Sequence, residues 1–139
     1  MNKRKINEWI PEAYTVLTEV KTYDKKKNED IYIVKECVID KTWRAQISTF
    51  GAAIATGSLI AAIAYFSDQG SSSVHRELLM QAIERLVLPE KSKTTLFKYV
   101  VQEVKNGNEA KVKEDVLNAA IALKLAMNLY TLRKDESNA

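Results

Sequence analysis

Cysteine and histidine are almost absent from this sequence of 139 residues, which has one of each, Cys37 and His75. A single cysteine excludes an internal disulfide, and we expect Cys37 to pack as a small hydrophobic residue inside a helix, as suits a reducing cytoplasm. One histidine and one distant cysteine are too few ligands for a zinc site. No apolar segment follows the basic N-terminus, so the sequence predicts no export signal and a cytoplasmic location.

Motifs of catalysis and phosphate binding are also lacking. Gly51 and Gly57 are not followed by the lysine and serine or threonine of a P-loop. Glu36 and Asp40, expected one helical turn apart, are interpreted as hydrated surface acids. We expect His75 to face solvent beside the start of a helix. The sequence therefore predicts no catalysis and no cofactor.

Charge is missing from residues 45–67, in a chain of which 28% is charged. A bilayer, the rest of the domain or other subunits could shield this stretch, since about 20 apolar residues can span a membrane. Thr56, Gly57 and Ser58 lie at its centre, however, and basic residues flank only one side. We interpret the stretch as two short, tightly packed helices that are joined at Gly57, in the left-handed conformation, and predict no membrane contact.

Helical periodicity is what the chain has in abundance. Its length and its 46% hydrophobic content fit one domain with a sizeable core. We predict an all-α fold, a compact bundle of about five to six helices within 1–134, followed by a flexible tail at 135–139. The expected helices cover about 6–23, 30–56, 59–66, the residues between Ser73 and Pro89, 93–106 and 109–133. Residues 31–34 could instead form a short strand, because they favour strands.

A second stretch, Val116 to Leu132, has Lys124 as its single charge and apolar residues on every face. A helix that is apolar all round is covered on more than one side. Two such segments in one small domain predict that some apolar surface remains for partners.

Basic residues are the candidate binding residues. A net charge of +3 is small, so contact with nucleic acid requires local clustering. Lys41 and Arg44 lie three positions apart beside Trp43, and such a group can hold a phosphate backbone. Alternatively, Lys41 pairs with nearby acids and Trp43 belongs to the core. Lys124 either reaches solvent along its own stem or points at a partner's phosphate, and the lysines at 25–27 are interpreted as solubilising.

The charge-free stretch has a recognisable order of motifs. Trp43-Arg44-Ala45 is followed by Phe50-Gly51-Ala52-Ala53-Ile54, then by Gly57-Ser58 and by an apolar helix over 59–66. This order resembles the central signature of the small subunit of the type III-B CRISPR effector, the Cmr complex, and the segment 122–126 is also similar to bacterial members. Ser58 stands where that family usually has its turn glycine.

The resemblance implies an all-helical, non-catalytic subunit that acts in antiviral defence and stacks in several copies as a minor filament. Its expected partners are the other subunits of the effector, further copies of itself, the CRISPR RNA and the target RNA, whose backbone it would contact. Arg44 is carried over from the aromatic-arginine match, and Lys41, Arg76, Arg85 and Lys124 are further candidate RNA contacts. A type III-A small subunit and a purely protein-binding helical adaptor are the alternatives.

Overall fold

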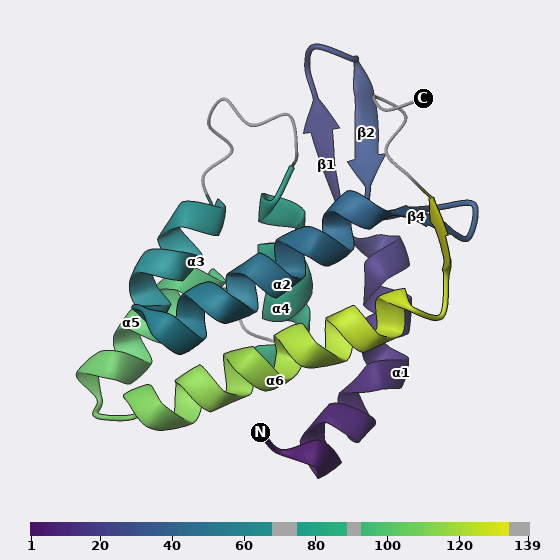
Figure 1. Cartoon of the computed structure of the whole chain (residues 1–139). Coiled ribbons are helices and arrows are strands. Elements are labelled where there is room, and N and C mark those ends of the chain that lie inside the picture. The colour runs from purple at the N-terminus through teal and green to yellow at the C-terminus, as the bar shows by residue number, and fades with distance from the viewer. Residues whose placement is uncertain (68–74, 89–92, 134–139) are drawn as a thin grey trace.

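The structure, a computed structural model, describes residues 1–67, 75–88 and 93–133. Within these residues the chain forms six helices and five short strands (Figure 1). The elements are, in chain order, α1 (Lys3–Glu19), β1 (Lys21–Asp24), β2 (Glu29–Tyr32), β3 (Val34–Lys35), β4 (Val38–Asp40), α2 (Lys41–Thr56), α3 (Leu59–Ser67), α4 (Glu77–Val87), α5 (Leu96–Lys105), α6 (Glu109–Met127) and β5 (Thr131–Arg133).

The fold is mostly helical, as predicted, but the all-α prediction is wrong for residues 21–40 and 131–133. β1 and β2 form an antiparallel hairpin, whereas β3, β4 and β5 form a second sheet in which β5 runs parallel to β4. The helix predicted over 30–56 therefore begins only at Lys41. The strand alternative for residues 31–34 is the correct one, apart from Ile33, which lies between β2 and β3.

The β3–β4 turn explains why a helix was predicted there. Val34 lies directly opposite Ile39 across this antiparallel pair, and both are buried. Glu36 and Cys37 form the turn between them, with positive φ angles of 53° and 63°. The apolar spacing therefore arises from a reversal of the chain instead of helical turns, and Glu36 and Asp40 do not share a helix. Cys37 is exposed, so the prediction that it packs inside a helix is wrong.

Helix α6 is the centre of the bundle and packs against α1, α2, α4 and α5. This confirms the prediction that an apolar helix in this region is covered on more than one side. It ends at Met127, short of the predicted end at Arg133, and the chain then continues into β5. Tyr130 fixes this exit, since its hydroxyl donates to the Tyr14 carbonyl at 2.6 Å and its ring stacks on the Tyr14 ring with centroids 4.4 Å apart.

The charge-free stretch forms two helices with a break at Gly57 and Ser58, as predicted. Gly57 has φ −138°, so the expected left-handed conformation is wrong. Glycine is needed there for space, because a Cβ atom would lie 3.0 Å from the Ala53 carbonyl oxygen. Ser58 caps α3 by accepting from the Ala61 N–H at 3.2 Å. Among the described residues, no helix combines the length and the apolarity that crossing a bilayer would need.

Caps and breakers set the other helix ends. Thr95 accepts from the Lys98 N–H at the start of α5, and Gly107, with φ +84°, follows its end. Helix α1 begins at Lys3, before the predicted start at residue 6, so Pro11 lies in its interior. Both Pro11 and Asn7, whose carbonyl loses its usual helical donor, are exposed to water. Ser73 and Pro89, which bound the predicted fourth helix, and the predicted tail at 135–139 lie outside the described residues.

Candidate nucleic-acid interface

The five predicted RNA contacts come from three parts of the bundle. Lys41 and Arg44 lie in the first turns of α2, Arg76 immediately precedes α4, Arg85 lies in its last turn, and Lys124 lies in the last turn of α6. Because α2 packs directly on α6, the candidates divide into an α2–α6 group and an α4 group.

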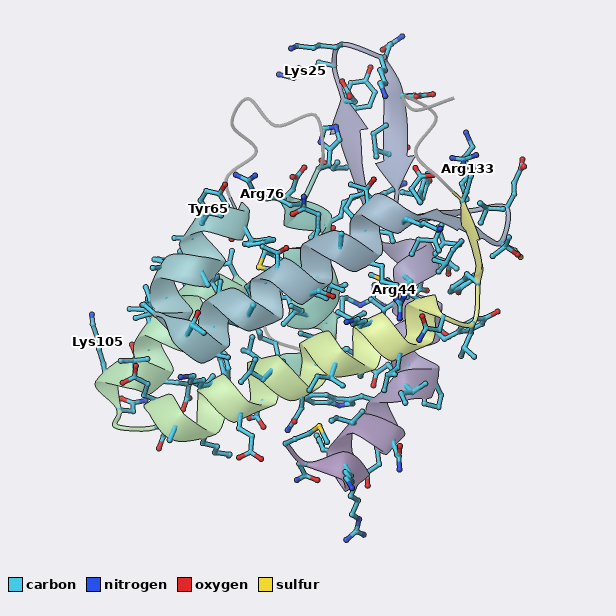
Figure 2. The ribbon with its side chains drawn as sticks, in the orientation of Figure 1. Lys25, Arg44, Tyr65, Arg76, Lys105 and Arg133 are labelled. Atoms are coloured by element: carbon cyan, nitrogen blue, oxygen red, sulfur yellow. The ribbon has the colours of Figure 1, made fainter. Side chains whose placement is uncertain are left out.

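The two arginines of the α4 group are engaged within the protein. The Arg76 guanidinium lies over the Tyr65 ring at 4.2 Å from its centroid, and its Nε donates to the Tyr65 carbonyl at 3.2 Å. Arg85 Nη2 lies 2.7 Å from Glu19 Oε1 in a half-exposed ion pair. Arg76 therefore joins α4 to the end of α3 (Figure 2), and Arg85 joins α4 to α1.

The α2–α6 group has no such partners. Within the described ranges no ion pair or side-chain hydrogen bond engages Lys41, Arg44 or Lys124. Arg44 extends from α2 toward α6 in Figure 2, and its Nε is buried without a hydrogen-bond acceptor. An unsatisfied buried donor of this kind costs about 1–3 kcal/mol.

Trp43 does not contribute a surface ring to this group. Its exposure is 7%, and it packs in the core with Ile47, Phe50 and Ile54 along the inner face of α2. The alternative that Trp43 is a core residue is therefore correct. Successive helical residues are rotated by about 100°, which places Arg44 at the side of the face that Trp43 buries.

From residue 45 onward, the outer face of α2 and α3 carries no charge, whereas the exposed Lys41 lies at its start. Its uncharged exposed members are small or aromatic, and Tyr65 is the largest of them at 62% exposure. The others are Ala45, Thr49, Ala52, Ala55, Thr56, Gly57, Ser58, Ala61, Ala64 and Ser67. On α6 and just beyond it, Leu125 and Leu129 are also exposed, at 42% and 63%. The structure thus leaves uncharged and apolar groups accessible on the layer formed by α2, α3 and α6 (Figure 1).

His75 lies in a cluster that the sequence did not reveal. Its Nε2 is 3.1 Å from Asp24 Oδ2 and its Nδ1 is 3.2 Å from Glu77 Oε1, and the three side chains are only 13%, 14% and 17% exposed. The expectation that His75 faces solvent is therefore wrong. The hydrogen bond from His75 is the main cause that lowers the pKa of Asp24, aided by donation from the Lys27 N–H.

This cluster is better suited to joining β1 to the start of α4 than to transferring a proton. Both ring nitrogens of His75 face carboxylates, so neither is directed at a reacting group. No signal in a single sequence indicates the pairing, since Asp24 and His75 are 51 positions apart. In the part of the chain that the structure describes, no group of three or more histidine, cysteine or acidic residues is placed to hold a metal ion.

A hollow of about 440 Å³ lies between the β1–β2 hairpin, β3–β4 and the start of α2. Its charged lining is balanced, with three basic residues and three acidic ones beside His75, namely Lys27, Lys35, Arg133, Glu29, Asp30 and Asp40. Arg133 Nε donates to Asp40 Oδ1 at 2.9 Å. The balance gives this hollow no preference for an anion or a cation.

Burial shifts two carboxyl groups elsewhere. Desolvation raises the pKa of Glu84 on α4, and it also raises the pKa of Asp115 on α6, where Lys111 and Lys5 oppose the effect. These groups lie on different helices and outside the α2–α6 group, so they suggest no acid–base pair.

Comparisons with known proteins identify no relative of the chain. No family model, curated protein or solved structure matches the chain. The assignment to the Cmr small-subunit family therefore stays a prediction from the sequence.

Proposed function

We propose that the chain is the non-catalytic small subunit of a type III-B CRISPR effector complex, in which stacked copies help to hold the guide and target RNA. One observation carries the proposal: the adjacent helices α2 and α6 combine three cations without acidic partners in the described ranges with an outer face on α2 that is uncharged from residue 45 onward. Cations of this kind are available to phosphates, and an uncharged face is available to protein.

The cations support backbone contact without sequence readout. Arg44 extends toward α6, whose last turn carries Lys124, and Lys41 lies one turn from Arg44. A phosphate oxygen beside the exposed Lys41 would accept a charge-assisted hydrogen bond from its ammonium group, and the half-buried Arg44 lies one helical turn away. Because Trp43 is buried, its ring is not available to stack on a base beside these cations. Base pairing between guide and target would then supply the sequence choice.

The uncharged face supports the stacking of copies. A filament requires head-to-tail contact between two different patches of the same subunit. Exposed alanines such as Ala52, Ala55 and Ala61 allow close approach of another backbone, and Tyr65 adds a large ring held by Arg76. Contact with effector subunits would use the same kind of surface.

The test is charge reversal at Lys41 and Arg44, K41E with R44E, in the effector complex reassembled with its other subunits. We expect the complex to assemble and to retain target RNA at least about tenfold less tightly, with a salt dependence reduced by about 1.5 in its logarithmic slope for two lost phosphate contacts. Filter binding across a salt series measures both quantities.

The matched control reverses two exposed basic residues on α1, K3E with R4E, and should leave retention unchanged. Unchanged retention in the Lys41 and Arg44 variant would contradict the placement of RNA on the α2–α6 group. It would instead favour the protein-binding adaptor, which the internal partners of Arg76 and Arg85 also suit. Co-purification with type III-A backbone subunits would assign the chain to the related effector.

A further inference from the structure

The β1–β2 hairpin projects from the helical body, and the proposed contacts on α2 and α6 do not include it (Figure 1). Its register pairs Lys21 with Tyr32 and Tyr23 with Asp30. Since side chains alternate between the faces of a strand, these four residues share one face, and all four are exposed. The other face, with Thr22 and Ile31, is half-buried. The hairpin therefore presents one fully solvated face.

Two tyrosines lie diagonally on this outward face. Tyr23 is 50% exposed and Tyr32 is 37% exposed. Diagonal neighbours across an antiparallel pair are about 7–8 Å apart, a separation within which both rings can engage one short ligand. The Tyr23 hydroxyl donates to the Asn28 side-chain oxygen, which holds this ring against the turn. Exposed aromatic rings beside cations are typical of surfaces that bind single-stranded nucleic acid, because every base has a face that can stack.

Three consecutive lysines, Lys25–Lys27, form the tip, and all are exposed (Figure 2). Asp24 shapes this turn, since its Oδ1 accepts from the Lys26 N–H at 2.9 Å and the Lys27 N–H at 3.2 Å. Asn28 closes the turn with a φ of 54°. The lysine side chains are thus carried by a turn of defined backbone shape.

Polar contacts tie the base of the hairpin to the body. The second carboxylate oxygen of Asp24 faces His75, which also faces Glu77 at the start of α4. On the outward face, the Lys21–Asp30 pair is separated by 3.8 Å and well exposed, so it contributes little. The carboxylate of Asp24 is directed at His75, and that of Asp30 lies beside Lys21. The tip lysines are therefore opposed mainly by Glu29.

The combination favours one class of partner. A membrane surface would be held by the lysines alone, at about 1 kcal/mol each, because residues 24–30 contain no apolar residue that could insert. Duplex RNA is disfavoured because its deep, narrow major groove does not admit a hairpin and its stacked bases are not free to lie on tyrosine rings. Single-stranded RNA offers both unstacked bases and a phosphate backbone.

We propose that the β1–β2 hairpin is an arm that binds single-stranded RNA, with bases stacked on Tyr23 and Tyr32 and phosphates held by Lys25, Lys26 and Lys27. This inference deepens the proposed function, since it takes RNA as the partner, and adds a contact separate from Lys41 and Arg44. Its test uses the free full chain, so its failure would leave the result in the reassembled complex unaffected.

The experiment measures the fluorescence anisotropy of a labelled twelve-residue oligoadenylate at low salt. Replacement of the three tip lysines by glutamine should weaken binding at least about tenfold and lower the logarithmic salt slope by about 2, the value for three phosphates on a single strand. The matched control replaces Lys3, Arg4 and Lys5 by glutamine, which removes the same charge from the start of α1, and should retain most of the affinity.

Stacking is tested separately from charge. Y23L with Y32L should weaken oligoadenylate binding about tenfold or more and leave the binding of inorganic polyphosphate unchanged. Y23F, which removes the bond to Asn28 but keeps the ring, should bind as the unmodified chain does. Amide NMR spectra of each variant confirm that the hairpin is still formed.

Three results would overturn the proposal. The first is oligoadenylate affinity that is independent of the tip lysines. The second is an equal loss of polyphosphate binding in the tyrosine variant, and the third is binding to phosphatidylserine vesicles that needs the lysines while oligoadenylate is not bound.

Discussion

The helical body and the β1–β2 hairpin of this protein are stabilised by different forces. The body buries large apolar side chains completely, among them Phe50, Phe66 and Leu123. No residue of β1 or β2 reaches full burial, so the hairpin depends on its hydrogen-bond ladder and on the Asp24–His75 contact. Segments with few buried apolar contacts open at lower free energy than the global unfolding transition. The comparison suggests a rigid scaffold with an arm that can open and close independently.

The largest effect is expected where the body is most tightly packed. Phe50 is fully buried, and its ring meets Phe66 edge to face with centroids 5.1 Å apart. F50A should reduce the free energy of unfolding by about 3–5 kcal/mol, because it removes buried area and leaves a cavity. Chemical denaturation followed by circular dichroism measures this loss.

Phe97 provides the matched control for that substitution. It is 38% exposed on α5, so F97A makes the same chemical change where less area is buried and should cost about 1–2 kcal/mol. Similar losses in both variants would contradict the view that burial in the body dominates stability.

A smaller effect is expected at Tyr130, where the body meets the β3–β4–β5 sheet. Y130F removes the hydroxyl that donates to the Tyr14 carbonyl and should cost about 1 kcal/mol at neutral pH. Y65F removes an exposed hydroxyl instead and should cost nothing measurable.

Tyr130 also predicts a pH dependence. Burial is the main cause that raises the pKa of Tyr130 from 10.0 to about 12, with Tyr14 adding to it. The folded state thus holds this proton more tightly than the unfolded chain, so the contribution is complete below pH 10 and is lost as the pH rises to about 12. Denaturation midpoints across this range should fall more steeply for the unmodified chain than for Y130F, and parallel curves would show that Tyr130 is not responsible.

The same two regions differ in how far the sequence predicted them. Apolar periodicity placed α3, the end of α2 and the start of α6 close to their observed positions, because a buried helical face repeats along the chain. The start of α2 and the end of α6 were misplaced, because short strands lie there instead of further helical turns. The strands of 21–40 have two to four residues each, which is too short for alternation to be distinguished from helical spacing. For α1 and α5 both ends differ from the prediction, since 6–23 and 93–106 were expected and Lys3–Glu19 and Leu96–Lys105 are observed.

The candidate site also contains parts that the sequence predicted and parts that it did not, for a related physical reason. Lys41, Arg44 and Lys124 could be selected because their neighbours along one helix are visible in the sequence. The engagement of Arg85 with Glu19 and of Asp24 with His75 joins residues 66 and 51 positions apart. Such contacts depend on how the helices pack, and a single sequence does not state that packing. The tyrosines of the hairpin were missed because their shared face exists only in the paired strands.

The smallest effect on global stability, and the most local one, is expected for D24N. Asparagine keeps an acceptor for the turn N–H groups of Lys26 and Lys27 but removes the negative charge that faces His75. Amide hydrogen exchange should therefore become faster in β1 and β2 and stay unchanged in α2 and α6. Faster exchange throughout the body would show that the hairpin is not an independent unit.

Acid should abolish the difference in hydrogen exchange between the unmodified chain and D24N. The hydrogen bond from His75 lowers the pKa of Asp24 in the folded state, so the charged carboxylate stabilises the closed hairpin at neutral pH, and that contribution is lost as the pH falls through the lowered pKa. Protection of the hairpin amides in the unmodified chain should then decline toward that of D24N when the pH is below the ordinary pKa range of an aspartate. E77Q, which removes only the other carboxylate facing His75, should retain this acid dependence because Asp24 remains. A hairpin that keeps its full protection in strong acid would show that the strand ladder alone holds the arm closed.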